Sequence, residues 1–495
     1  MPKTSNLRRN SMLLPGSALF GLALILFGFF QAPPDEIFRG LHTIVTHEDV
    51  LITDYIALAG MGAAFVNAGL VTLISVVILK VVNDPINGAT LVTVGLMAGF
   101  SLFGKNIVNI WPILTGTAAY AVLREESFAH HVNVALRATA LSPVVSFMGV
   151  RYSPWLGVVV GVLIGFLTPC VAEYVHQVQN GMNLYTLGFA CGLLAMILVP
   201  VFKALGLNPE PAHYWSTGNN ALLGAALTVL CLAFIGLGLS YRPRRVLKKY
   251  WALLHTSGRG PSDYVRTFTP GPVLVNMGVN GLIATLYIVL TGGDLNGATI
   301  GAIFTIIGFS GYGKHAFNIV PVMAGVLLGG LTNHVDPNSS SMQLAGLFGT
   351  TLAPFAGVFG APFGVLAGLL HSSVVLQAGL PLEGMNLYNN GFSGGLVAIV
   401  LYPILESIVK NRRPVLLEED LFAMFDEDTP QSPADLPPKE RRERRDRRSG
   451  RDRRSGKDRR VSREVWTGEE RRSGKERRCG KERRSGKDRR LGDGA

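Results

Sequence analysis

The sequence predicts an all-α polytopic membrane protein with two inverted-topology helical repeats, short or re-entrant broken helices and a disordered C-terminal tail. Three observations lead to this prediction: long apolar runs almost free of charge, an internal duplication, and a change of composition after residue 414. Only 16% of the 495 residues are charged. A membrane-spanning helix needs about 20 apolar residues, and no soluble core could cover so many such runs. A soluble fold is therefore excluded.

Charge is concentrated near the C-terminus. Residues 439–490 hold 25 Lys and Arg and 11 Asp and Glu, a net charge of +14, whereas the whole chain carries +12. The pI near 9.6 therefore describes this tail, and the apolar body is close to neutral. The tail repeats a six-residue pattern, [Asp/Glu]-Arg-Arg-[Ser/Cys]-Gly-[Lys/Arg], with almost no apolar residues. Such a composition cannot form a packed core.

An internal duplication organises the body of the chain. Residues 87–116 recur without a gap as residues 296–325, and 13 of the 30 positions are identical. The shared residues include Asn-Gly-Ala-Thr, Gly-Phe-Ser, Gly-Lys and a Pro, which two unrelated apolar segments would not share in register. We interpret this as a true repeat.

The duplication extends well beyond this stretch. Further pairs are Val66, Asn67 and Gly69 with Val275, Asn276 and Gly278, residues 138–143 with 349–354, and Gly-Met-Asn-Leu-Tyr at 181–185 with the same sequence at 384–388. The two halves of the body therefore descend from one ancestral unit.

Apolar runs give the expected spans. Residues 12–31 form the first run, which is long for a cleaved signal peptide, so we expect a retained span. The later runs are 56–79, 88–103, 107–123, 132–150, 155–171, 183–202 and 222–239, followed by their counterparts in the second repeat.

Basic clusters predict the orientation of these spans. Residues 1–11, 242–249 and 410–414 are rich in Lys and Arg and are expected inside, whereas residues 32–50 and 204–217 are poor in them. The second repeat then starts and ends inside, and the first starts and ends outside, with residues 222–239 as the reversing span. Inverted repeats of this kind are common in secondary transporters.

These boundaries divide the chain into five parts. They are an N-terminal segment with the first helix (1–50), membrane repeat 1 (51–206), a linking helix and cytoplasmic loop (207–261), membrane repeat 2 (262–412) and a disordered cytoplasmic tail (413–495).

Lys105 and Lys314 are the main candidate site residues. Each stands at a Gly-Lys turn between two runs of apolar residues that are short for a full crossing. If these runs are half-helices that meet at mid-depth, each ammonium lies deep in the membrane and marks a pathway for an anionic solute. Alternatively, the runs cross fully and the lysines reach water at the interface.

Paired polar residues complete the candidate site. Asn67/Asn276, Asn109/Asn318 and Asn183/Asn386 occur once in each half, and each pair could line a path for a solute or hydrogen-bond across helices as structural contacts. Thr90 and Thr299 follow Asn87 and Asn296 at expected helix starts, where they could cap backbone N–H groups and direct a positive helix end at a solute.

Other ionisable residues give weaker signals. Glu173 and His176 occur only in the first repeat and could relay protons, although we favour the interpretation that they form an interfacial pair between spans. His371 is a lone histidine in an apolar run. The four cysteines have no metal or disulfide spacing. No nucleophile, phosphate-loop or metal motif is present, so we expect neither an enzyme nor a cofactor.

The body resembles an uncharacterised bacterial inner-membrane family with a duplicated domain of unknown function (number 1576). The resemblance covers roughly residues 50–410 and lies in the NGAT…GFS…GK…NI…P and GMNLY…GF motifs. It implies a membrane location but no activity. A weaker likeness links residues 84–88, Asp-Pro-Ile-Asn-Gly, to urea-transporter-type channels, although the second copy lacks the Pro and both copies add a Lys.

Together these features predict a multi-pass inner-membrane transporter or channel for a small polar or anionic solute. Its site would lie between the repeats, and the N-terminus and tail would be cytoplasmic. The alternative is a membrane-anchored signalling or scaffold protein that acts through its basic tail. The expected partners are a small solute and membrane lipids, including anionic lipids at the tail. Nucleic acid is not expected, and a homo-oligomer is left open.

Overall fold

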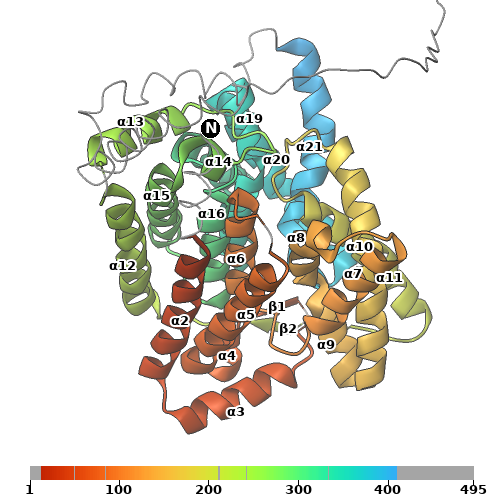
Figure 1. Ribbon diagram of the computed structural model, residues 1–495. Coiled ribbons are helices and arrows are strands. Elements are labelled where there is room, and N and C mark those ends of the chain that lie inside the picture. The colour runs from red at the N-terminus through yellow and green to blue at the C-terminus, as the bar shows by residue number, and fades with distance from the viewer. Residues whose placement is uncertain are drawn as a thin grey trace, which may run out of the picture. The chain divides into compact units, whose positions relative to one another are not determined.

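The computed structural model describes residues 13–49, 51–83, 85–209, 212–240, 242–332 and 334–409 (Figure 1). The predicted tail and the basic N-terminal residues lie outside this part of the chain. Ten helices among the described residues are long and apolar enough to cross a membrane. The chain is therefore a helical, multi-pass membrane protein, as predicted.

Among the described residues, the first half of the body contains ten helices. They are α2 (Leu13–Gln31), α3 (Pro34–Val45), α4 (Tyr55–Ala59), α5 (Met61–Val81), α6 (Gly88–Phe100), α7 (Trp111–Leu123), α8 (Phe128–Ala138), α9 (Ser142–Arg151), α10 (Pro154–Val178) and α11 (Thr186–Ala204), with the 3-10 turn η1 (Thr139–Leu141) between α8 and α9.

The second half repeats this order element by element. It contains α12 (Asn220–Leu239), α13 (Pro243–Leu253), α14 (Tyr264–Phe268), α15 (Pro270–Leu290), α16 (Gly297–Phe309), α17 (Ala316–Thr332), α18 (Ser340–Phe348), α19 (Ala353–Phe359), α20 (Ala361–Ala378) and α21 (Asn389–Ile408), with the 3-10 turns η2 (Gly349–Leu352) and η3 (Leu380–Leu382).

The structural correspondence reaches further than the sequence comparison. Helix α2 packs along α5 through Gly28, which lies against Gly62, and α12 packs along α15 through Gly238, which lies against Gly271. Helices α2 and α3 therefore have counterparts in α12 and α13, which the sequence analysis placed in a linking segment. Each half thus begins with a long peripheral helix.

Helices α6 and α16 form the centre of the body. Almost every residue of both is buried. Gly99 lies against the backbone of Gly301, and Gly297 at the start of α16 lies against Leu102 beyond the end of α6. The start of each helix therefore meets the end of the other, so the two repeats contribute antiparallel helices to one core.

The central helices are short. Helices α6, α7 and α16 have 13 residues each and α17 has 17, so a 13-residue helix is about 20 Å long. A bilayer core is roughly 30 Å thick. The expectation of short helices on either side of each Gly-Lys turn is therefore met by the structure.

A short two-stranded sheet departs from the all-α prediction. Strand β1 (Leu51–Thr53) pairs in parallel with β2 (Ala212–Tyr214), with Ile52 opposite His213. Three-residue strands lack a periodic pattern that could be recognised in the sequence. The pair joins the start of repeat 1 to the loop before α12.

Two amphipathic helices lie at opposite ends of the body. Helix α3 is at the bottom of Figure 1 and α13 is at the top. Their charges differ: α3 carries Asp35, Glu36 and Arg39, whereas α13 carries two arginines and two lysines at residues 244, 245, 248 and 249. Although α3 and α13 correspond to each other in the duplication, they give the two ends of the body different charges.

Candidate functional site

Two aspartates tie each repeat to the central helix of the other. The Asp54 carboxylate accepts a hydrogen bond from the Gly297 N–H at 3.0 Å, and the Asp263 carboxylate accepts one from the Gly88 N–H at 3.0 Å. Carboxylates stabilise helix starts because these carry free N–H groups and a partial positive charge. Both lie outside the candidate spans, and burial raises the pKa of each carboxyl against the opposing effect of these donors.

Sequence reasoning missed these aspartates, although a signal was present. Asp54-Tyr55 and Asp263-Tyr264 are separated by the same 209 residues as the central repeat. Their roles are equivalent: the Tyr55 N–H donates to the Leu102 carbonyl, and the Tyr264 N–H donates to the Gly311 carbonyl. A search for matched polar residues outside the apolar runs would have found them.

The paired asparagines in α5 and α15 brace the Gly-Lys turns. The Asn67 amide donates to the carbonyls of Ser101 and Lys105, at 2.7 and 2.8 Å. The Asn276 amide does the same to the carbonyls of Ser310 and Lys314, at 2.8 and 2.7 Å. Each satisfies carbonyls that the end of a helix leaves free. Of the two interpretations, this geometry corresponds to a structural contact.

Four further predicted residues have similar local roles. The Asn109 amide donates to the Gly104 carbonyl at 3.0 Å, and the Asn318 amide donates to the Gly313 carbonyl at 2.8 Å. Thr90 and Thr299 form capping boxes with the asparagines that precede α6 and α16. Each repeat therefore holds its broken segment in the same way.

Both predicted lysines are fully buried. The side chains of Lys105 and Lys314 are 0% exposed, so neither ammonium reaches water at an interface, and the alternative of snorkelling lysines does not describe the structure. Within the described residues, neither lysine makes an ion pair. Burial of a lysine side chain without a counter-charge is costly.

The surroundings of the two ammonium groups differ. The Lys314 ammonium donates to the Tyr185 hydroxyl and, at 2.7 Å, to the Thr350 hydroxyl. It also lies 4.3 Å from the centre of the Tyr185 ring. The Lys105 ammonium contacts the Met97 sulfur at 3.3 Å. Lys314 is therefore held by two hydroxyl groups, and Lys105 by a thioether.

An aromatic cluster lies between the two lysines. The rings of Tyr185 and Tyr388, which precede α11 and α21, are 4.9 Å apart. Phe309 lies 4.7 Å from Tyr185, and Phe100 lies 4.9 Å from Tyr388. These four residues form two pairs of the duplication, so the cluster sits on the approximate symmetry axis of the core.

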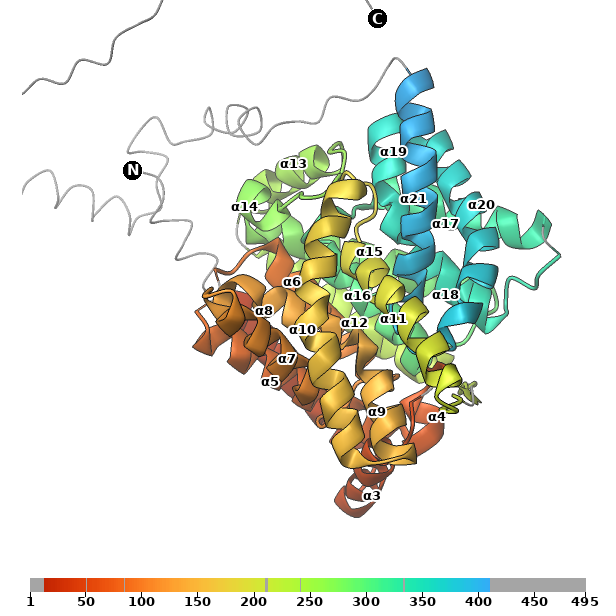
Figure 2. The ribbon, with the colours of Figure 1, turned by 90° about the vertical axis from the view of Figure 1, so that its right-hand side faces the viewer.

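The two Gly-Met-Asn-Leu-Tyr segments lock the starts of α11 and α21 together. The Asn183 amide donates to the Gly391 carbonyl, and the Asn386 amide donates to the Gly188 carbonyl, both at 3.2 Å. Gly188 is required for this packing because a Cβ there would lie 2.0 Å from the Tyr388 ring. Figure 2 shows α11 and α21 leaving this point in opposite directions.

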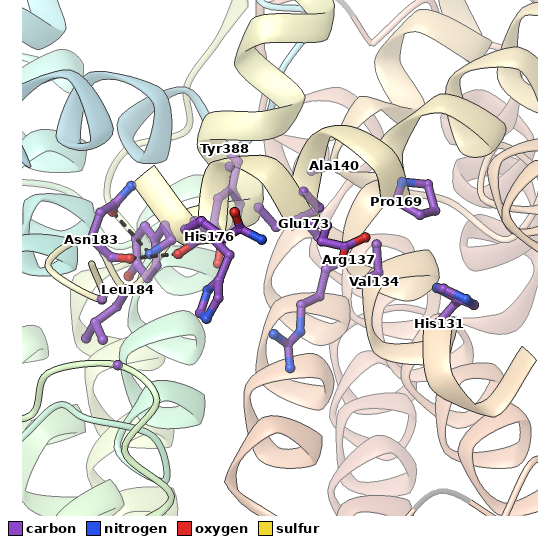
Figure 3. A pocket seen from close by; sticks show the side chains of 18 of the residues that line it. His131, Val134, Arg137, Ala140, Pro169, Glu173, His176, Asn183, Leu184 and Tyr388 are labelled. Atoms are coloured by element: carbon purple, nitrogen blue, oxygen red, sulfur yellow. Dashed lines mark hydrogen bonds between the residues drawn. The ribbon is translucent and has the colours of Figure 1, made fainter. Parts of the chain in front are cut away.

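A cavity of about 640 Å³, here called the central cavity, opens beside this junction (Figure 3). Its outer wall includes the exposed side chains of Glu173 and His176 on α10. Its inner wall includes Arg137 of α8 and the buried Tyr185 and Tyr388. Residues from both repeats line it, so it lies between the two halves.

Part of the cavity wall comes from the segment that follows α13. This segment contacts the segment after α10: the Arg259 guanidinium donates to the Asn180 carbonyl at 2.7 Å, and the Gly260 N–H donates to the Gly181 carbonyl at 3.0 Å. Gly181 and Gly260 both line the cavity. The cavity therefore reaches the end of the body that carries α13.

The predicted site residues are only partly gathered at this cavity. Of the ten candidates, Asn183 lines it, and Lys314 lies behind Tyr185 in its wall. Arg137 was missed because it has no counterpart of the same type: the matching position in the second repeat is Phe348. A search for differences between the repeats, rather than identities, would have singled it out.

The structure also locates the other ionisable residues that the sequence analysis considered. Glu173 and His176 line the cavity with no hydrogen bond between them in the described structure. His371 is buried in α20, with its Nε2 atom 3.1 Å from the Asn390 side-chain oxygen. Within the described ranges, no three His, Cys, Asp or Glu residues are grouped as metal ligands.

Comparison with known proteins gives one match. A family model described as "Protein of unknown function (DUF1576)" matches residues 33–204 and again residues 242–407. The two matches begin at α3 and α13 and end within α11 and α21, in agreement with the structural correspondence. No curated protein and no solved structure matches the chain. The likeness to urea-transporter-type channels stays a prediction from the sequence.

Proposed function

Because the chain belongs to the DUF1576 family, a family of unknown function that is matched twice here, we propose a function from the geometry of its core. The protein moves a small polar or anionic solute across the membrane, as a transporter or channel, without enzymatic chemistry. The observation that carries this proposal is the central cavity between the two repeats, which ends at Tyr185 with the buried ammonium of Lys314 behind it.

The arrangement of the repeats supports a transport role. The antiparallel contact of α6 and α16 is the contact expected if the halves are inserted in opposite directions. Short helices that end at mid-depth, together with inverted repeats, are a common basis of solute sites in transporters. Buried basic groups in a membrane usually mark a substrate path.

The charges of α3 and α13 give the proposed orientation in the bacterial inner membrane. Lys and Arg accumulate on the cytoplasmic side of membrane proteins. The basic helix α13 and both chain termini then face the cytoplasm, and α3 faces outward. The central cavity, whose wall includes the segment after α13, lies toward the cytoplasm in this arrangement.

Flux measurements on the purified protein in proteoliposomes test the proposal. A panel of labelled carboxylates, phosphate and small neutral solutes identifies the transported class. Lys314→Ala and Lys105→Ala should each reduce flux without loss of folding. The effect should be larger for Lys314, because its ammonium holds Tyr185 and Thr350. Lys80→Ala, at an exposed position at the end of α5, is the matched control.

Two outcomes would contradict the proposal. Flux at the wild-type level in both buried-lysine variants would remove these residues from the mechanism. Absence of flux for every solute, combined with loss of the cellular phenotype on deletion of residues 415–495, would favour the scaffold that acts through its basic tail.

A further inference from the structure

The central cavity is lined mostly by residues of the first repeat, and one matched pair of residues differs between the halves at its wall. Arg137 at the end of α8 corresponds to Phe348 at the end of α18, and the next turn is conserved between the halves. Phe348 is buried and packs 5.9 Å from Phe100 and 6.3 Å from Tyr185. Arg137 lines the cavity instead. In one half an aromatic ring fills this space, and in the other a cation borders it.

Arg137 is fixed at the cavity wall. Its guanidinium donates to the Thr93 hydroxyl at 2.9 Å and to the Ala89 carbonyl at 2.6 Å, both on α6. A guanidinium retains its charge at all ordinary pH values and matches the planar geometry of a carboxylate. The hydrogen bonds to α6 therefore hold a permanent positive charge at the edge of the cavity.

The first turn of α11 adds a second favourable element for an anion. Thr186, Leu187 and Gly188 all line the cavity. This 19-residue helix has no side-chain cap at its start. The first N–H groups of a helix have no partner within it, and the positive end of the helix attracts anions.

A buried hydroxyl without a partner marks the same place. Tyr388 is 6% exposed and lines the cavity, and its ring rests on Gly188 in the first turn of α11. Within the described structure, its hydroxyl has no hydrogen-bond partner. The equivalent hydroxyl, that of Tyr185, bonds Lys314. A buried polar group that lacks a partner costs free energy unless a ligand or water satisfies it.

On these grounds we propose that the central cavity binds the carboxylate group of a small monocarboxylate solute, between the Arg137 guanidinium, the Tyr388 hydroxyl and the first turn of α11. Glu126 and Glu173 in the cavity lining disfavour anions that carry several charges, such as phosphate. This inference rests on the proposed transport function, for which it names the substrate class. It also assigns Arg137 as the residue that selects for charge.

Binding to the full-length protein in detergent tests the subsite directly. Thermal unfolding is followed in increasing acetate, with acetamide as the neutral isostere and inorganic phosphate as the competing anion class, at constant ionic strength. A ligand that binds only the folded state raises Tm in a saturable way. We expect stabilisation by acetate, and neither acetamide nor phosphate should reproduce it at equal concentration.

Variants separate a binding role from a structural one. Arg137→Phe, which copies the second repeat, should abolish the acetate effect, and Arg137→Lys should restore part of it. Tyr388→Phe keeps the ring on Gly188 and should weaken acetate affinity about tenfold, as expected for one hydrogen bond to a charged group. Arg151→Gln is the control, because Arg151 pairs with Glu48 away from the cavity.

The outcomes distinguish this inference from the transport proposal. Equal stabilisation of wild type and Arg137→Phe, or stronger stabilisation by phosphate or acetamide, would overturn the subsite whether or not the protein transports solutes. Acetate binding that depends on Arg137, without flux of any carboxylate in proteoliposomes, would support the subsite and contradict transport.

Discussion

The two halves of the molecule have the same order of helices, but the side chains at their centre differ. In the second repeat, Lys314 is held by the hydroxyls of Tyr185 and Thr350. In the first, the equivalent Lys105 contacts the Met97 sulfur, and the Tyr388 hydroxyl has no partner in the described structure. Both tyrosines line the central cavity, so the two sides differ in whether the tyrosine hydroxyl is bonded to a lysine.

This difference shows how the two copies of a duplicated unit can come to have different side chains around the same backbone. The elements that hold the two repeats together are preserved in both copies: the crossed aspartate caps, the asparagines that brace the Gly-Lys turns, and the glycines at helix contacts. Among the positions that differ, Arg137 lines the cavity and Met97 contacts Lys105, where the second repeat has Phe348 and Ile306. The matched contacts hold the two halves together, and these two unmatched residues lie at the cavity and at Lys105.

The largest expected effect concerns the opposed orientation of the halves. In a variant without native cysteines, a single cysteine is introduced by Thr43→Cys in α3 or by His255→Cys after α13; both positions are exposed. A membrane-impermeant maleimide should label intact cells only at position 43, and permeabilised cells at both, because α3 and α13 lie at opposite ends of the body. Labelling of both positions from the same side would show that the repeats are not inverted.

The second largest effect is expected for substitutions where the starts of α11 and α21 pack together. At Gly188 a Cβ would lie 2.0 Å from the Tyr388 ring, whereas at Gly391 the nearest atom would be 2.9 Å away. Overpacking of a well-filled core costs about 1–3 kcal/mol, so Gly188→Ala should lower the free energy of unfolding more than Gly391→Ala. Thermal unfolding in detergent measures both.

Gly236→Ala is the control for this comparison, because no atom lies within 4 Å of the Cβ it would add. If Gly188→Ala were as stable as this control, the contact between Tyr388 and the start of α11 would not have the geometry described here.

The smallest effect is expected for the crossed caps. Removal of a capping carboxylate costs about 1 kcal/mol, so Asp54→Ala and Asp263→Ala should both lower Tm modestly. Asp54 should matter more, because it also accepts hydrogen bonds from the N–H and hydroxyl of Ser216, at 2.9 and 2.5 Å. A larger decrease in Tm for Asp263→Ala than for Asp54→Ala would contradict this ranking of the two caps.

The sequence by itself determined the class, the duplication and the capped starts of two repeated helices. These properties follow from local composition and from residues in register: apolar runs require a bilayer, and Asn87 and Asn296, each followed by Thr three residues later, predict the capped starts of α6 and α16 that the structure shows. The burial of Lys105 and Lys314 was one of two alternatives, since a short apolar run is compatible with either depth.

Only the tertiary structure decided which residues meet across the repeats. Asp54 and Gly297 are 243 positions apart, and no pattern along the chain links a carboxylate to a distant helix start. The correspondence between α2 and α12 could not be recognised in the sequence, because lipid-facing surfaces tolerate almost any apolar residue. The cavity depends on how Arg137, Tyr388 and α11 converge, and such convergence is a property of packing between helices, which the periodicity of a single helix does not contain.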